Sequence, residues 1–265
     1  MSFVQIRDLS AGYSGKTILN NISFSMESGE IVGVLGANGS GKTTLLKAVC
    51  GILPHRGQCT VDGATLEGLP PKKLGRLCGY IPQRSGISID ISVLDVVLMG
   101  FNPMLGLLEH PTAAMKKRAA AMLAETGLAG KENENYLQLS EGQKQLCVLA
   151  RALVSDGKLL LLDEPESALD FRHRRTAFDL LKRQTAEKNR TVLVTLHDPN
   201  LALNRCDRLI LLCEGRISAI LSPGSDSEKH MADELSKIYG PVSLHRVKDG
   251  RGHDRLVMIG EDNYD

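Results

Sequence analysis

The feature that most constrains the fold of this chain is a glycine-rich loop that follows directly on a continuous apolar run. The run, GEIVGVLG at 29–36, is typical of a strand buried inside a parallel sheet. The next residues, GANGSGKT at 36–43, match the pattern G-x-x-x-x-G-K-[ST], in which glycines let backbone N–H groups point at phosphate oxygens. The helix expected after the loop would direct its positive end at the same anion. We therefore predict a nucleotide-phosphate site formed by Gly36, Asn38, Gly39, Ser40, Gly41, Lys42, Thr43 and Thr44, in which the Thr43 hydroxyl can also bind Mg²⁺.

A second apolar run ends in two carboxylates. Four leucines at 159–162 precede Asp163 and Glu164, which is typical of a buried strand whose carboxyl end presents acids to a ligand crevice. Asp163 is the candidate for holding Mg²⁺, and Glu164 is the candidate for orienting and deprotonating an attacking water. Together with the glycine-rich loop, this pair predicts hydrolysis of a nucleoside triphosphate.

The segment LSEGQ at 139–143 lies just upstream of the second run. Ser140 and Gln143 form a capping-box pattern, and the leucines that follow at helical spacing predict an amphipathic helix that begins here. Two interpretations remain open at this point. The segment is either simply a well-capped helix start or a second anion site, offered to the γ-phosphate of another nucleotide.

These motifs, in this order, resemble the ATP-binding subunits of ATP-binding cassette transporters. The resemblance covers roughly residues 3–220 and rests on Tyr13, the loop at 36–43, Gln83 in GYIPQ, LSEGQ at 139–143, LLLLDEP at 159–165, SALD at 167–170, and His197. It implies binding of ATP with Mg²⁺. It also implies that Tyr13 stacks on adenine, that Gln83 contacts Mg²⁺ and the attacking water, and that His197 contacts the γ-phosphate.

The resemblance further implies that the site is shared between two copies of the chain. Ser140, Gly142 and Gln143 would contact the ATP bound to the other copy, and Asp170 would cross the dimer interface. One departure from the family pattern stands at position 141, where glutamate replaces the usual glycine. A carboxylate at this position would repel the γ-phosphate unless the side chain turns outward. We therefore expect the turnover rate to depend on the direction in which Glu141 points.

The expected fold is α/β: a P-loop NTPase core with a mainly parallel sheet, an antiparallel N-terminal β region and an inserted helical lobe. We expect an ATPase domain at 1–220, with the lobe at about 85–155, and a C-terminal extension at 221–265 of one helix and two short strands. An apolar part of the lobe, with Met99, Phe101, Met104 and Leu105, is either an exposed docking patch or lobe core.

The function that these features predict is ATP hydrolysis that drives an importer. The resemblance implies a homodimer of this subunit, two transmembrane permease subunits, a substrate-binding protein, and a place at the cytoplasmic face of the membrane. The stretches GYIPQ…ISVLDVVLMG, HDPNLA and IYGPV are similar to importers of metal chelates such as siderophore-iron, haem or cobalamin. An importer of an oxyanion such as molybdate is an alternative. Two further alternatives are a non-transport cassette ATPase of iron–sulfur assembly or DNA repair and a module that binds nucleotide without turnover.

Charge and cysteine content argue against a nucleic-acid partner, disulfides and a zinc site. Lysine plus arginine number 32 against 31 acidic residues, so the basic excess typical of a nucleic-acid binder is missing and we expect no nucleic-acid partner. The six cysteines form no C-x-x-C pair and mostly lie in apolar stretches, which favours buried free thiols over disulfides or a zinc site. The N-terminus lacks the pattern of a secretion signal, and no apolar run approaches the ~20 residues of a membrane span.

Overall fold

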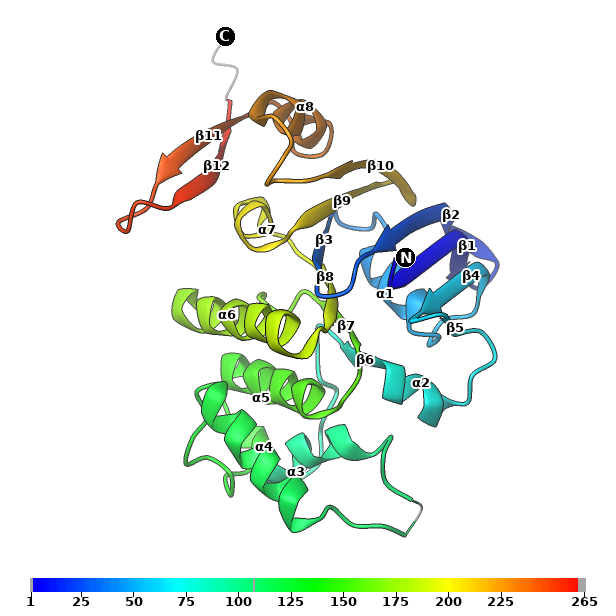
Figure 1. The fold of residues 1–265 in the computed structure, drawn as a ribbon, viewed down its shortest axis with the longest axis vertical. Coiled ribbons are helices and arrows are strands. Elements are labelled where there is room, and N and C mark those ends of the chain that lie inside the picture. The colour runs from blue at the N-terminus through cyan, green and yellow to red at the C-terminus, as the bar shows by residue number, and fades with distance from the viewer. Residues whose placement is uncertain (1, 107, 262–265) are drawn as a thin grey trace.

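A six-stranded, mainly parallel sheet forms the centre of the molecule in this computed structural model, which describes residues 2–106 and 108–261 (Figure 1). Its order is β10-β9-β3-β8-β7-β6, and only β10 runs antiparallel to its neighbour. The central strands β3, β7 and β8 are buried along their whole length, as continuous apolar runs predict. The strands are β3 (Ile31–Leu35), β6 (Cys78–Ile81), β7 (Leu159–Asp163), β8 (Thr191–Thr195), β9 (Arg208–Cys213) and β10 (Arg216–Leu221).

The expected antiparallel N-terminal region is a second, four-stranded sheet of order β2-β1-β4-β5. It lies beside the core sheet, with helix α1 (Lys42–Val49) against both (Figure 1). Side chains of this sheet, of α1 and of one face of the core sheet form a single hydrophobic cluster. Its strands are β1 (Val4–Tyr13), β2 (Lys16–Met26), β4 (His55–Val61) and β5 (Ala64–Thr65), and α2 (Pro71–Leu77) follows.

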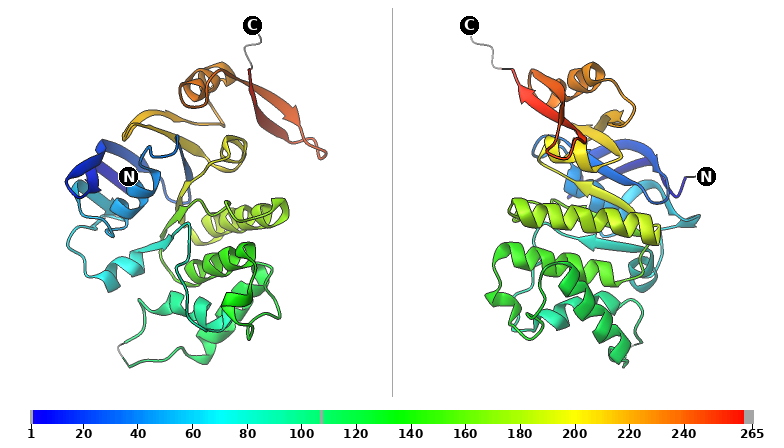
Figure 2. Two further views of the ribbon diagram at one scale, coloured as in Figure 1. Left: turned by 180° about the vertical axis from the view of Figure 1, so that it is seen from behind. Right: turned by 60° about the vertical axis from the view of Figure 1, so that its left-hand side comes forward.

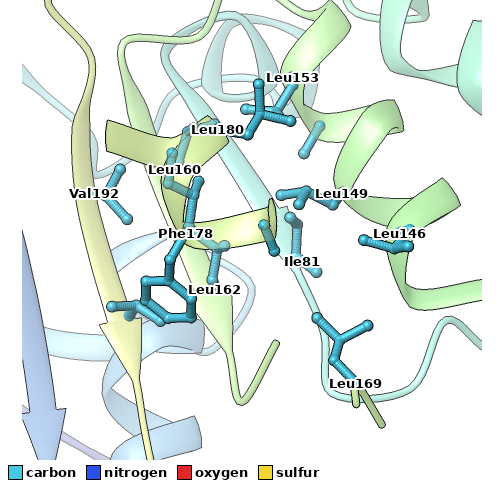
Figure 3. Packing of buried hydrophobic residues seen from close by; sticks show 14 of the residues in the cluster. Ile81, Leu146, Leu149, Leu153, Leu160, Leu162, Leu169, Phe178, Leu180 and Val192 are labelled. Carbon is cyan, nitrogen blue, oxygen red and sulfur yellow. The ribbon is translucent and has the colours of Figure 1, made fainter. Parts of the chain in front are cut away.

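Helices cover the other face of the core sheet. The alternation of side chains along β7 divides its leucines, because Leu159 and Leu161 join the α1 side while Leu160 and Leu162 join the opposite side. Figure 3 shows Leu160 and Leu162 packed among residues of α5 (Glu141–Val154) and α6 (Phe171–Lys188). The two clusters fix β7 between two packed layers, and its carboxyl end carries Asp163.

A group of helices between β6 and β7 occupies the position expected for the inserted lobe. Figure 1 shows this group in shades of green, with α5 on the side of the core sheet. Phe101 is buried to 1% exposure, while Met99, Met104 and Leu105 are half-buried. The lobe-core interpretation therefore holds for Phe101. The elements are α3 (Val93–Leu98), η1 (Met99–Phe101), α4 (Ala113–Glu125), η2 (Tyr136–Gln138) and α5.

After β10 the chain forms α8 (Glu228–Tyr239) and a hairpin of β11 (Val242–Lys248) with β12 (Asp254–Gly260), as expected for the C-terminal segment. The hairpin lies at the opposite end of the molecule from the helical lobe and rests on α7 (Pro199–Arg205) (Figure 2). Residues 1 and 107 of the range 1–220 and residues 262–265 of the range 221–265 lie outside the described residues. No helix within residues 2–106 and 108–261 is long and apolar enough to cross a membrane.

Candidate functional site

The glycine-rich loop joins β3 to α1 in a conformation that requires its glycines. Gly41 precedes the helix with φ +106°, in the left-handed region that favours glycine. A Cβ on Gly36 would lie 2.3 Å from the carbonyl oxygen of Leu212, so only glycine fits there. The hydroxyl of Ser40 is buried and has no hydrogen-bond partner within the described chain. The loop thus holds a backbone cradle with an unpaired polar group.

Lys42 lies over this loop and is 5% exposed. Its Nζ donates to the carbonyl oxygen of Gly36 at 2.8 Å and lies 3.3 Å from that of Ala37. Burial lowers the pKa of the ammonium, and the nearby carboxylates of Glu164 and Asp163 oppose that shift by favouring the charged form. The cation is therefore fixed at the mouth of the loop and faces the acidic end of β7.

Asp163 meets the loop directly. Thr43 Oγ1 donates to Asp163 Oδ1 at 3.0 Å, so the structure brings together these two predicted residues. Two residues that the motifs did not single out hold the same carboxylate: Thr195 Oγ1 donates to Oδ1 at 2.9 Å, and Tyr80 hydroxyl donates to Oδ2 at 3.4 Å. Thr195 pairs with Asp163 in the parallel register of β7 and β8, which is the signal that identifies it.

Glu164 contacts two further predicted residues, which belong to separate segments of the chain. Gln83 Nε2 donates to Glu164 Oε2 at 2.5 Å, and His197 Nε2 lies 2.6 Å from Glu164 Oε1. Glu164 has φ +49°, a left-handed conformation that costs about 1–3 kcal/mol in a non-glycine residue. Its backbone N–H donates to Thr195 Oγ1 at 3.0 Å, which helps to hold this conformation. Backbone strain at such a position is typical of functional sites.

Glu166 is a further acid that the motif comparison did not identify. It is 3% exposed, and its Oε1 accepts a hydrogen bond from the backbone N–H of His197 at 3.0 Å. Burial raises the pKa of this carboxyl, and the bond from His197 opposes the shift. The acidic spacing LLLLDEPE is the only sequence signal for it. Its contact fixes the backbone from which the His197 side chain extends.

The LSEGQ segment forms the predicted capping box at the start of α5. Ser140 Oγ accepts from the Gln143 N–H at 3.3 Å, and Gln143 Oε1 accepts from the Ser140 N–H at 3.1 Å. Glu141 turns outward, with its side chain 80% exposed and paired to Lys144 at 2.8 Å. A Cβ on Gly142 would lie 3.0 Å from the Ala168 carbonyl oxygen. Across residues 2–106 and 108–261, no hydrogen bond or ion pair joins this segment to the glycine-rich loop.

The acids at 163–166 form one cluster, which we call the acidic cluster. Two other predicted residues lie apart from it. Asp170 is exposed and caps α6, accepting a hydrogen bond from the His173 N–H at 2.8 Å. The next residue, Phe171, is 84% exposed, which is unusual for a large apolar side chain. Tyr13 ends β1 at the turn into β2, with 41% of its surface exposed. Within this chain, Tyr13 is thus accessible to a flat ligand.

Comparison with known proteins assigns this arrangement to a family. The family model described as ABC transporter matches residues 19–167, a stretch that contains the glycine-rich loop, Gln83, LSEGQ, and Asp163 and Glu164 at the end of β7. The chain belongs to the ABC transporter family. It is an ATP-binding and ATP-hydrolysing cassette of α/β fold, and the loop, the acidic cluster and His197 together form its candidate nucleotide site.

Several relatives align over almost the whole cassette. The hemin import ATP-binding protein HmuV of Rhizobium leguminosarum is 37% identical over 245 residues, covering 89% of this chain and 90% of its own. HmuV of Vibrio cholerae is 32% identical over 254 residues, covering 93% and 95%. Among solved structures, a chain of an ABC transporter described as metal-chelate type, in an inward-facing conformation, matches with TM-score 0.81 and 26% identity over 98% of both chains.

Proposed function

We propose that this cassette powers the import of a metal chelate, with haem the first candidate. The observation that carries the hydrolytic part is the contact of Gln83, Glu164 and His197 at the end of β7, beside the phosphate-binding loop. The cargo class is supported by the names of the relatives, which concern hemin import, and by the similarity to a metal-chelate type transporter.

The donor set around Asp163 fits Mg²⁺. Thr43 and Asp163 offer a hydroxyl and a carboxylate only 3.0 Å apart, and Gln83 donates through its nitrogen, which leaves its amide oxygen available. Hard oxygen ligands of this kind are those that Mg²⁺ prefers. Bound there with ATP, the ion would neutralise charge on the β- and γ-phosphates. Lys42 would exchange its bonds to loop carbonyls for phosphate oxygens, and Ser40 would gain a partner for its buried hydroxyl.

Glu164 is the general base in this proposal. Its two contacts, with Gln83 and His197, orient the carboxylate, so that it can accept a proton from a water positioned opposite the γ-phosphate. His197, whose backbone N–H donates to Glu166, would contact the γ-phosphate. Gln83 would report the state of the site to the membrane subunits. Because the carboxylate is already oriented, Glu164 itself would need little reorientation when ATP binds.

The complete site requires two copies of the chain. Ser140 and Gln143 are bonded to each other and, within the described residues, not to the loop of their own chain, which supports their use, together with Gly142, by a second copy. The start of α5 offers free N–H groups and a positive dipole end to the γ-phosphate of the partner's ATP. Asp170, next to the exposed Phe171, would lie at the interface, and Tyr13 would stack on adenine.

The cassette would occupy residues 1–220, the lobe at about 85–155 would face two permease subunits at the cytoplasmic side of the membrane, and 221–265 would be an added extension. A substrate-binding protein would deliver the cargo. The exclusion of nucleic acid as a partner stays a prediction from charge. A non-transport cassette is the competing function, and oxyanion import is the competing cargo.

Co-purification and reconstitution test this proposal. The tagged chain, isolated from its own cells with mild detergent, should bring down an apolar membrane protein. The reconstituted complex should accumulate haem in vesicles when ATP is supplied, and a complex with Lys42→Ala should not. Recovery with soluble iron–sulfur scaffold proteins alone would contradict the importer assignment. ATP-driven uptake of molybdate in place of haem would contradict the cargo.

A further inference from the structure

We propose that His55, Cys59 and Glu67 form a binding site for a divalent cation of the zinc class, separate from the nucleotide site. His55 and Cys59 belong to β4, and Glu67 follows β5 in the antiparallel sheet. Their ligand atoms, the His55 and Glu67 side-chain nitrogen and oxygen and the Cys59 sulfur, all lie within 4.8 Å of one another. No hydrogen bond or ion pair of these three residues reaches the glycine-rich loop or the acids at 163–166.

The spacing of these atoms is close to what a tetrahedral ion requires. His55 Nε2 lies 3.0 Å from Glu67 Oε1 and 3.7 Å from Cys59 Sγ. An ion with bonds of about 2.0–2.3 Å separates its ligands by about 3.3–3.8 Å, and both distances from His55 lie within a few tenths of an ångström of that range. Imidazole, thiolate and carboxylate are the ligands that zinc uses, and three of them leave a fourth position for water.

An irregularity in the sheet brings the two β4 ligands together. Residues four apart on a straight strand are about 13 Å apart along its axis. Opposite Gly57, the pairing shifts from Arg7–Gln58 to Ser10–Arg56, so β1 gains one residue over β4. Gly57 has φ +96°, and a Cβ there would lie 2.5 Å from the Arg7 carbonyl oxygen. Such bulges re-aim side chains and are common beside functional sites.

Bonds from the surrounding backbone orient each ligand. His55 Nδ1 lies 3.3 Å from the carbonyl oxygen of Leu53, which directs Nε2 into the cluster. Glu67 Oε1 accepts from the Cys59 N–H at 2.6 Å, and Leu66 N–H donates to the Cys59 carbonyl at 2.9 Å. Metal-binding histidines usually donate their second nitrogen in this way. The ligands are therefore held in position by bonds that a bound cation would leave intact.

Burial and charge also favour a cation. The Cys59 side chain is fully buried and that of His55 is 6% exposed, while that of Glu67 is 31% exposed and gives solvent access. Binding would release the thiol proton of Cys59. One thiolate and one carboxylate then balance the two charges of the ion. The sequence pattern does not reveal this site, because only one of its ligands is a cysteine.

Metal titration of the reduced, chelator-treated full chain without nucleotide tests the site. We expect one Zn²⁺ per chain in competition with a chromophoric chelator. Co²⁺ in its place should give a thiolate-to-metal charge-transfer band. His55→Gln and Cys59→Ala should each weaken binding by at least about a hundredfold, because loss of an outer contact alone costs 10–100-fold. Cys213→Ala and His245→Gln, which alter an exposed cysteine and a histidine elsewhere, are the matched controls and should bind as the unaltered chain does.

Two outcomes would overturn the site. One is binding that is equal in the unaltered chain and in His55→Gln, and the other is a Co²⁺ spectrum without a thiolate band. ATP binding by each variant checks that it is folded. If Cys59→Ala does not fold, the metal affinity of Glu67→Gln and the Co²⁺ spectrum of the unaltered chain still test the site. Because the readout is metal affinity, its result is independent of the proposed transport function.

Discussion

At the scale of single residues, the main prediction is that Glu164 acts as the general base. Its strained backbone conformation and its two side-chain contacts all position one carboxylate. Glu164→Gln keeps the size of the side chain but removes the base. Turnover should fall by about 10²–10⁴, while ATP binding is retained. Steady-state ATPase rates and size-exclusion chromatography with ATP and Mg²⁺ measure the two effects, and an ATP-trapped dimer is expected. Unaltered turnover together with a monomeric elution would contradict the assignment.

Glu141 is the residue at which the resemblance predicts a departure from the usual family pattern. Its carboxylate is 80% exposed and paired with Lys144, which points it away from the helix start. An exposed pair of this kind contributes well under 1 kcal/mol, so Glu141→Gly should change the ATPase rate by no more than about twofold. Lys144→Ala is the matched control, since it frees the same carboxylate without removing it. A tenfold rise in rate for Glu141→Gly alone would mean that the carboxylate opposes the γ-phosphate.

Motifs predicted the candidate ligand-binding residues, but not the residues that hold them in position. The glycine-rich loop, Asp163 and Glu164 were identified because their spacing is rigid, and the structure places Thr43 against Asp163. Thr195 and Glu166 were not identified, since each acts by holding another residue and has no motif of its own. The His55–Cys59–Glu67 cluster depends on a bulge, which hydrophobic periodicity does not show.

At the scale of elements, continuous apolar runs predicted the buried strands, and turn and cap residues predicted helix limits. Ser140 caps α5 through the side-chain bond that the sequence predicted, and the structure shows a further cap of this kind where Thr112 begins α4. The expected antiparallel N-terminal region includes β1 and β2, which continue up to a tight turn where Tyr13 pairs with Lys16. The antiparallel direction of β10 follows from its hairpin with β9, and the apolar pattern carries no signal for direction.

The attachment of the C-terminal hairpin rests on two asparagines of α7. Asn204 donates to the Leu256 carbonyl at 2.7 Å and accepts from its N–H at 3.1 Å, while Asn200 Oδ1 accepts from the Met258 N–H at 2.7 Å. Asn204→Ala leaves two groups of the β12 edge unpaired, which costs about 1–3 kcal/mol. Amide exchange in β12 should accelerate about tenfold to a hundredfold. ATP affinity should not change, because the hairpin takes no part in the proposed ATP site.

Asn102→Ala is the control for this measurement, since Asn102 is exposed in the helical lobe. Unchanged exchange of the Leu256 and Met258 amides in Asn204→Ala would show that packing of α8 against β11 holds the hairpin without the asparagines. Loss of ATP binding would instead show that residues 221–265 are part of the cassette rather than an addition to it.

At the scale of the whole molecule, one chain holds one glycine-rich loop and one LSEGQ helix start, and no hydrogen bond joins them within residues 2–106 and 108–261. Family resemblance predicted that separation, whereas composition and periodicity carry no signal for it. The exposed Phe171 beside Asp170 adds an apolar side chain that a partner could cover. The proposed arrangement is a head-to-tail dimer in which each ATP lies between Lys42 of one copy and Ser140 of the other.

Mixing two inactive variants tests this arrangement. Lys42→Ala removes the cation that meets the phosphates, and Ser140→Arg removes the cap and blocks the helix start. In a mixed head-to-tail dimer, one site carries both defects and the other carries neither. If equal amounts pair at random, about half of the dimers are mixed, so roughly a quarter of the sites regain their full set of residues. ATP-dependent dimerisation, followed by size-exclusion chromatography, should be absent for each variant alone and return on mixing. If each site were built within one chain, every subunit would carry a defect and mixing would restore nothing, so failure to recover any ATP-dependent dimer would contradict the shared site.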